Sequence, residues 1–141
     1  MPPQATPPAD ERTLTELDRA RIGTLLRRTG TTEANREMLE ELLALADEVP
    51  SRQVDADVVT MYSQVQIEDP QGGNPRTLAV CYPEEADADA GRVSVLSPIG
   101  AALLGLRVGA TARWKTPDGR AHQARIVGIT FQPEASGDYT R

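Results

Sequence analysis

Few residues in this sequence could carry out acid–base, nucleophilic or metal chemistry. His122 is the single histidine and Cys81 the single cysteine. No serine and carboxylate accompany His122 in the pattern of a catalytic triad, and no CxxC or HExxH spacing is present. We therefore interpret His122 as a solvated strand residue and Cys81 as a small buried residue. The expectation is a protein that is not an enzyme, with no catalytic residues, no metal and no cofactor.

The acidic segment between Glu84 and Gly91 is the nearest approach to a metal-binding motif. A twelve-residue calcium loop ends on a bidentate glutamate. A loop starting at Asp87 would place Pro98 at that position, and one starting at Glu85 would place Leu96 there. Both registers fail, so we interpret the segment as a solvated turn or as a patch for a basic partner.

Charge and hydropathy restrict the classes of partner. The chain has 141 residues, 15 basic and 21 acidic, and a formal net charge of −6. Because phosphate contacts require lysine and arginine in excess, no strong direct binding to nucleic acid is expected. No segment is long and apolar enough to span a membrane, and no secretory signal is visible. We expect a cytoplasmic monomer that binds another protein.

The elements that position these residues fall into two parts. Residues 1–12 are rich in proline and predict a disordered tail. Residues 13–50 predict a helical hairpin that packs as a short antiparallel coiled coil about 25 Å long. Thr13 and Glu16 would form the capping box of the first helix, and Gly30 would end that helix. The second helix would bury a stripe of apolar residues, namely Ala34, Met38, Leu42, Leu45 and Val49.

Residues 51–56 predict a linker, and residues 57–141 predict a β-rich domain. Short apolar runs separated by turn residues indicate an antiparallel sheet. The expected strands are 58–61, 65–67, 77–82, 93–96, 110–115 and 124–131. Ser97 and Pro98 would open one short helix, because serine caps helices and proline suits the first helical position. Trp114 lies on a predicted strand and is assigned to the core. The fold class is α+β.

Several segments of the C-terminal part match a known family in order along the chain. They are Val58-Val59-Thr60-Met61 with Ser63, Val80-Cys81-Tyr82-Pro83, residues 94–109, residues 131–135 and Gly137-Asp138-Tyr139. Over these about 80 residues the chain resembles the C-terminal domain of the Gre transcript-cleavage factors. Within that family the resemblance is strongest to the Rnk-type regulators of nucleoside diphosphate kinase.

The resemblance implies an FKBP-like fold from about residue 57 and docking at the rim of the secondary channel of RNA polymerase. Family members dock through an Asp-Ser-Pro turn. Ser97 and Pro98 match this turn, Leu96 replaces the Asp, and Ile99 follows, so the expected partner-binding residues are 96–99.

The tip of the helical hairpin separates a regulator from a cleavage factor. Gre factors carry two acids, three residues apart, at this tip. Here the tip reads Gly30, Thr31, Thr32 and Glu33, so one acid at most is kept. The resemblance thus implies a regulator that competes with Gre factors without stimulating RNA cleavage. The alternatives are a transcript-cleavage factor and a peptidyl-prolyl isomerase.

Overall fold

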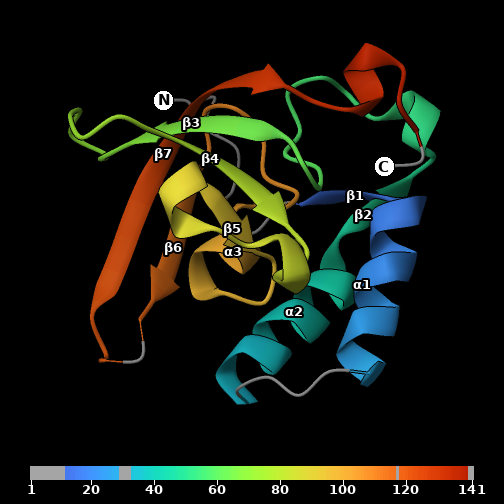
Figure 1. Cartoon of the computed structure of the whole chain (residues 1–141), viewed down its shortest axis with the longest axis horizontal. Helices are drawn as coiled ribbons and strands as arrows, with labels where there is room; N and C mark the ends of the chain where they lie inside the picture. Colours follow the sequence, from blue (N-terminus) through green and yellow to red (C-terminus); the bar gives the residue numbers. More distant parts are fainter. Residues whose placement is uncertain (1–11, 29–32, 117, 140–141) are drawn as a thin grey trace, which may run out of the picture.

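The computed structural model describes residues 12–28, 33–116 and 118–139. Two helices lie beside a curled sheet that wraps around a third, shorter helix (Figure 1). The predicted tail at 1–11 and the tip residues Gly30, Thr31 and Thr32 lie outside the described residues. Within the described part, no helix combines the length and the apolar character needed to cross a membrane.

The first helix starts later than its sequence predicts. Helix α1 spans Glu16–Arg28, and its cap is Thr15, whose Oγ1 accepts a hydrogen bond from the Asp18 backbone N–H at 3.0 Å. Thr13 is not the cap, because Thr13–Thr15 form strand β1. This strand pairs in parallel with β2, Asp47–Val49, which follows the second helix. A two-stranded sheet therefore closes the base of the helix pair.

The second helix, α2, spans Glu33–Leu45, and the stripe that it buries overlaps the predicted one only in part. Leu39 and Leu42 are buried, whereas Leu45 is 68% exposed and Met38 is only partly buried. The reason is tertiary, because α2 packs against α3 (Pro98–Leu103) and this contact fixes its rotation. The predicted stripe is therefore right at Leu42 and at Met38, which packs against the core, and wrong at Leu45.

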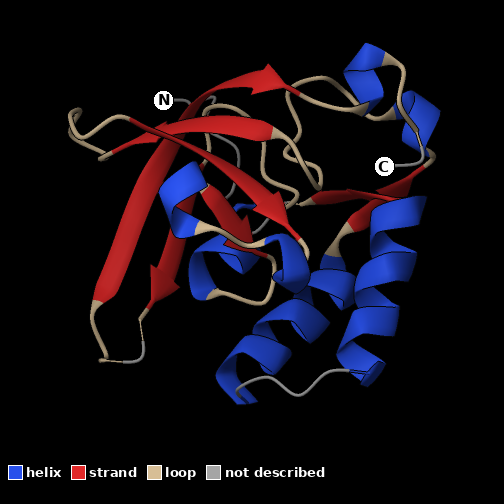
Figure 2. Cartoon of the chain, viewed as in Figure 1, coloured by secondary structure: helices blue, strands red, loops and turns tan. Residues whose placement is uncertain are grey.

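The main sheet has five strands in the order β5-β4-β3-β7-β6 (Figure 2). The strands are β3 Gln64–Glu68, β4 Arg76–Cys81, β5 Arg92–Ser94, β6 Thr111–Lys115 and β7 Ala121–Phe131. Short 3-10 turns lie at Ser51–Gln53, Pro83–Glu85, Ala88–Ala90 and Glu134–Ser136. The α+β class is confirmed.

Two features of the predicted sheet are wrong. The sheet is mixed, because β4 and β5 pair in parallel: the chain crosses through two 3-10 turns before it enters β5. The predicted strand at 58–61 is not regular structure, since Val58 forms only an isolated bridge with Arg107. Its backbone groups instead bond to the segment after α3, as when Val59 N–H donates to Leu106 O at 2.8 Å.

One apolar core joins both parts of the chain. Its buried members from the helix pair and β1 are Leu14, Ile22, Leu26, Leu39 and Leu42, and they pack in the same cluster as Val59, Met61, Leu103, Leu104 and Ile126. Each such side chain contributes about 1.5–3 kcal/mol when fully buried. The helix pair therefore depends on the sheet for burial. The boundary drawn at 51–56 stays a prediction.

A buried carboxylate stands where the two parts meet. Asp18 of α1 is 1% exposed, and its Oδ2 accepts a hydrogen bond from the Met61 backbone N–H at 3.0 Å. Arg12 adds a second contact between the two parts, because its Nη1 donates to the carbonyls of Ala101 and Leu104, each at 2.9 Å. These bonds satisfy backbone groups that α1 and the sheet would otherwise bury unpaired.

Burial makes the ionised form of Asp18 costly. Desolvation raises the pKa of Asp18 from 3.8 to about 6, the Met61 N–H opposes this, and the nearby charge of Glu134 adds to it. The folded state thus binds the proton more tightly than the unfolded chain does. Its contribution to stability is complete below about pH 4 and is lost as the pH rises through about 6.

The substitution Asp18→Asn tests the effect of Asp18 ionisation on stability. Asparagine keeps an oxygen that can accept the Met61 N–H bond but cannot ionise. We expect the variant to gain roughly 1–3 kcal/mol in free energy of unfolding at pH 8 relative to wild type, and no gain at pH 4. Urea unfolding at several pH values measures the difference.

Asp18→Leu is the control, because it leaves the buried Met61 N–H without its acceptor. We expect this variant to lose about 1–3 kcal/mol at every pH. If the free energies of unfolding of wild type and Asp18→Asn change in the same way between pH 4 and 8, the raised pKa of Asp18 is contradicted.

Candidate functional site

The turn that enters α3 is held by its own side chains. The Ser97 hydroxyl accepts a hydrogen bond from Gly100 N–H at 3.1 Å and donates to the Ser94 carbonyl at 2.6 Å. The Ser94 hydroxyl accepts from Leu96 N–H at 3.0 Å. Pro98 occupies the first helical turn, as predicted. This docking candidate is a rigid feature of the fold.

Gly100 is required for this turn to close. A Cβ atom at this position would lie 2.0 Å from the Ser94 carbonyl oxygen. The backbone of the segment after β5 therefore passes directly against α3, and no larger residue fits without moving one of them. The glycine positions the serine cap and the proline.

The turn is less accessible than a protruding docking loop would be. Leu96, Ser97, Pro98 and Ile99 are all half-buried, and Leu96 and Ile99 pack against the core. Asn35, in the first turn of α2, donates from its side-chain amide to the Leu96 carbonyl at 2.5 Å. The structure thus brings the predicted docking turn against the start of the second helix.

This contact also locates the described part of the hairpin tip. Glu33 is the first residue of α2 and is exposed. It lies two residues before Asn35, so the hydrogen bond to the Leu96 carbonyl ties the first turn of α2 to the turn before α3. Each helix has 13 residues, which corresponds to about 20 Å at 1.5 Å per residue.

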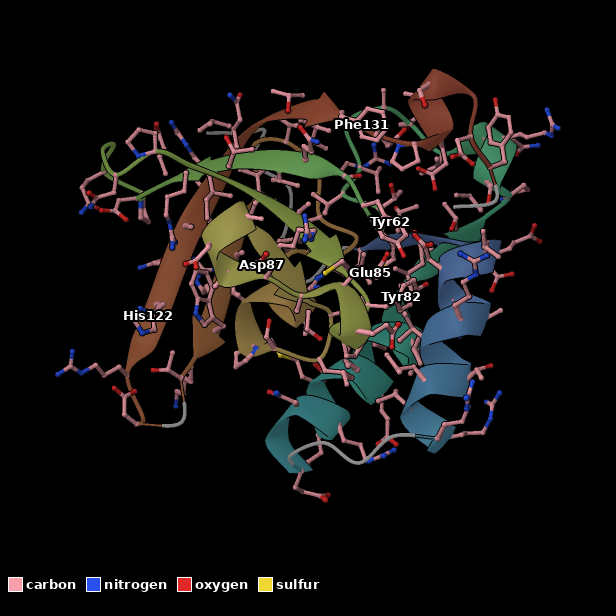
Figure 3. All side chains as sticks on the ribbon, viewed as in Figure 1. Tyr62, Tyr82, Glu85, Asp87, His122 and Phe131 are labelled. Atoms are coloured by element: carbon pink, nitrogen blue, oxygen red, sulfur yellow. The ribbon has the colours of Figure 1, made fainter. Side chains whose placement is uncertain are left out.

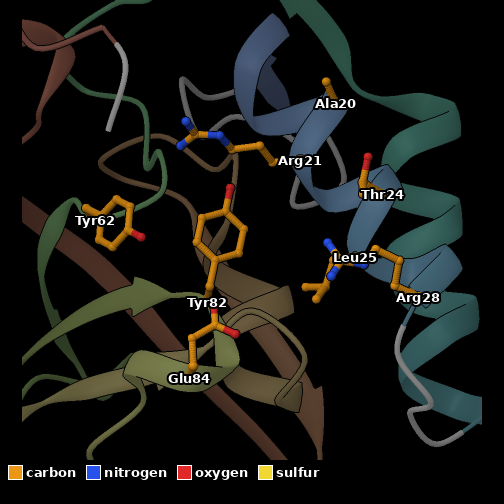
Figure 4. A pocket seen from close by; sticks show the side chains of 8 residues that line it. All are labelled: Ala20, Arg21, Thr24, Leu25, Arg28, Tyr62, Tyr82 and Glu84. Atoms are coloured by element: carbon orange, nitrogen blue, oxygen red, sulfur yellow. The ribbon is translucent and has the colours of Figure 1, made fainter.

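An open cleft of about 550 Å³ separates α1 from the end of β4 (Figure 4). Arg21, Thr24 and Arg28 line it from α1, while Tyr62, Tyr82 and Glu84 line the opposite wall. The two tyrosine rings meet edge to face, with centroids 5.9 Å apart (Figure 3). The sequence did not bring the two walls together, because the α1 residues and Tyr62 are at least 34 residues apart in the chain.

The tyrosines do not supply a base. Burial raises the pKa of both phenols above its ordinary value. The Tyr62 hydroxyl donates to Glu85 Oε1 at 2.5 Å, and this carboxylate further favours the protonated phenol. Both groups are therefore neutral at physiological pH, and the cleft presents hydrogen-bonding and cationic groups.

The other candidates for chemistry are a buried thiol next to the cleft wall and an exposed imidazole outside the cleft. Cys81 is fully buried, and burial raises the pKa of its thiol, as suits a core residue. His122 is exposed on β7, on the side of the sheet away from the tyrosine pair (Figure 3). Across the described ranges, no group of three or more His, Cys, Asp or Glu residues is arranged to hold a metal ion.

One structural residue, Asp18, was not predicted from the sequence. Asp18 is polar and sits in a helix, so nothing marked it as buried. A signal was present, because Thr15 and Asp18 are three residues apart in the capping pattern that was assigned to Thr13 and Glu16. Trp114 was assigned to the core, and it packs against the core while remaining half-buried.

Comparisons with known proteins agree with this architecture. The family "Transcription elongation factor, GreA/GreB, C-term" matches residues 53–131. The chain is 34% identical over 132 residues to the "Regulator of nucleoside diphosphate kinase" of Escherichia coli strain K12, covering 89% of this chain and 93% of that protein. It is 33% identical over 105 residues to the "Transcription elongation factor GreA" of Desulfovibrio desulfuricans, covering 74% of this chain and 64% of that protein.

A solved structure shows the same fold. The "Prokaryotic transcription elongation factor GreA/GreB from Nitrosomonas europaea" superposes with a TM-score of 0.72 at 32% identity. The match covers 86% of this chain and 98% of that one, so it includes the helix pair as well as the sheet. The chain therefore belongs to the GreA/GreB family of transcription elongation factors and is similar over most of its length to a regulator of nucleoside diphosphate kinase.

Proposed function

We propose that this protein is a monomeric regulator that binds RNA polymerase at the rim of the secondary channel and excludes Gre-type cleavage factors without stimulating RNA cleavage. The observation that carries the proposal is the contact between Asn35 and Leu96. It ties the start of α2 to the sheet part. The family relationship supports polymerase as the partner, since relatives carry the names of transcription elongation factors.

The geometry of the helix pair argues against a cleavage role. A cleavage factor has to deliver carboxylates to a magnesium ion inside the polymerase, where carboxylates and substrate phosphates hold the metal. Helices of about 20 Å provide little reach, and part of that length lies along the sheet part. Glu33 is the one acid in the tip sequence, and Gly30 stands where the first acid of the Gre pair would be.

The turn at 96–99 is the proposed docking element. Its backbone is fixed by two serine hydroxyls, so little conformational entropy is lost when a partner binds it. Leu96 and Ile99 leave part of their apolar surface exposed beside Pro98. An apolar, preorganised patch of this kind suits a small hot spot in a protein interface.

A transcript-cleavage factor and a peptidyl-prolyl isomerase are the remaining alternatives, and no specific contact favours either. The first needs a pair of carboxylates at the tip. The second needs an enclosed aromatic pocket, whereas the tyrosine cleft is open and has arginines and a glutamate on its walls.

The cleavage prediction uses stalled elongation complexes with labelled transcripts. We expect saturating wild-type protein to leave cleavage at background, because neither a carboxylate pair nor sufficient reach is available. It should lower cleavage driven by a Gre factor in a concentration-dependent way. Gly30→Asp supplies the missing acid but no reach, so this variant should also remain at background.

Robust cleavage by the wild-type protein alone would replace the regulator by a cleavage factor. Recovery of cleavage in Gly30→Asp would show that the wild-type protein lacks only the second carboxylate and that its helix pair is long enough to reach the metal.

The docking prediction uses Pro98→Glu. Glutamate is tolerated at the start of a helix, where its charge complements the helix dipole, so α3 should still form. We expect affinity for core RNA polymerase to fall by roughly 1–3 kcal/mol, or about 5- to 150-fold, as measured by titration of labelled full-length protein.

Pro75→Glu is the matched control, because Pro75 is exposed in the turn before β4 and the substitution introduces the same charge. Its affinity should equal that of wild type. If folded Pro98→Glu binds as tightly as Pro75→Glu, the turn does not belong to the interface.

A further inference from the structure

The β6–β7 hairpin carries positive charge on an otherwise acidic protein. Residues 111–126 hold four basic residues, namely Arg113, Lys115, Arg120 and Arg125, and one acidic residue, Asp118. The rest of the chain has 11 basic and 20 acidic residues. Although the net charge of the chain is −6, this hairpin has a local excess of positive charge.

Two of these cations are available to a ligand. Arg120 pairs with Asp118 at 3.5 Å, and Arg125 pairs with Glu68 at 3.4 Å. No described residue forms an ion pair with Arg113 or Lys115, and both are exposed. They flank Trp114 on strand β6, so they lie on the sheet face opposite its ring, and the groove at this sheet edge is lined by both cations as well as by the ring.

Trp114 is stacked on the single histidine. Trp114 and His122 are direct cross-strand partners, and their rings lie 5.7 Å apart at an interplanar angle of 14°. The Thr116 hydroxyl is 3.3 Å from His122 Nε2, which helps to orient the imidazole. Stacking on the half-buried Trp114 orders the exposed His122 ring before any ligand arrives.

This surface is open to large ligands. A shallow groove of about 350 Å³ is lined by Trp114, His122, Arg113, Lys115 and Gln123, together with Ala121. Strand β6 is the outermost strand of the sheet, so no further strand covers it. Figure 3 shows His122 far from Tyr62 and Tyr82, and the groove shares no lining residue with the tyrosine cleft.

We propose that the β6–β7 hairpin binds single-stranded nucleic acid, with a base stacked on the Trp114–His122 pair and phosphates contacted by Arg113 and Lys115. Aromatic faces beside cations are the common means of binding single strands, since every base offers a π-face and every linkage a negative charge. In a duplex the faces of the bases are stacked on one another and are not available to an aromatic side chain. An acidic polypeptide would use the cations alone and would leave the stacked pair without a role. This inference concerns the protein without polymerase and does not depend on the function proposed above.

Trp114 is the chain's single tryptophan, so its fluorescence reports on this site alone. The experiment titrates full-length protein with twelve-residue oligouridylate and oligodeoxythymidylate at low salt. We expect saturable quenching, and half-saturation should shift to higher concentration as salt increases, since each phosphate contact releases a counterion. Arg113→Gln combined with Lys115→Gln should weaken binding at least tenfold. His122→Ala should weaken it about fivefold or more through lost stacking.

Two controls separate this site from general charge attraction. Arg27→Gln combined with Arg28→Gln removes two exposed adjacent cations from the end of α1, and its binding should equal that of wild type. Poly-L-glutamate should neither quench Trp114 nor displace the oligonucleotide. The proposal is overturned by absence of saturable quenching, by equal loss in the α1 variant, or by poly-L-glutamate competing as well as the oligonucleotides do.

Discussion

The helices α1 and α2 are too short to bury their apolar surface against each other, and the rest of the structure follows from this constraint. Each has 13 residues, and each packs only part of its circumference on its neighbour. Ile22, Leu26, Leu39 and Leu42 are buried because α3 and the sheet supply the missing partner surface. Once the helices lie on the sheet part, their polar groups also need partners there, which explains the buried bond from Met61 to Asp18 and the bond from Asn35 to Leu96.

The same constraint links packing to the proposed activity. A helix pair that must lie against the sheet part for stability cannot also extend its full length into a partner. In a member of the GreA/GreB family this geometry is compatible with occupying a binding site and unfavourable for delivering carboxylates to a distant metal. The turn at 96–99 and the start of α2 are neighbours for the same reason, and a change in one alters the surroundings of the other.

Charge is distributed as unevenly as apolar surface. Acidic residues cover α2 and the loop before β5, whereas the β6–β7 hairpin collects cations around its aromatic pair. The net charge sums over all surfaces of the molecule. It therefore affects which partners the whole molecule attracts but does not determine what one hairpin can bind.

The sequence by itself determined the local elements, the family resemblance and the absence of a recognisable catalytic motif. Strands β3, β4, β6 and β7 and helix α3 are found close to their predicted positions, because alternation, turn residues and the Ser97-Pro98 pair are local signals. Tertiary structure decided the rest. Which stripe of α2 is buried depends on α3, and the parallel pairing of β4 with β5 depends on the path of the crossover.

The burial of Asp18 and the tyrosine cleft bring together residues that are distant in the chain, and the Trp114–His122 stack depends on the register of the β6–β7 hairpin, so propensity and periodicity alone do not encode them. The physical reason is that burial and pairing energies depend on neighbours in space, whereas propensity and periodicity depend on neighbours in sequence.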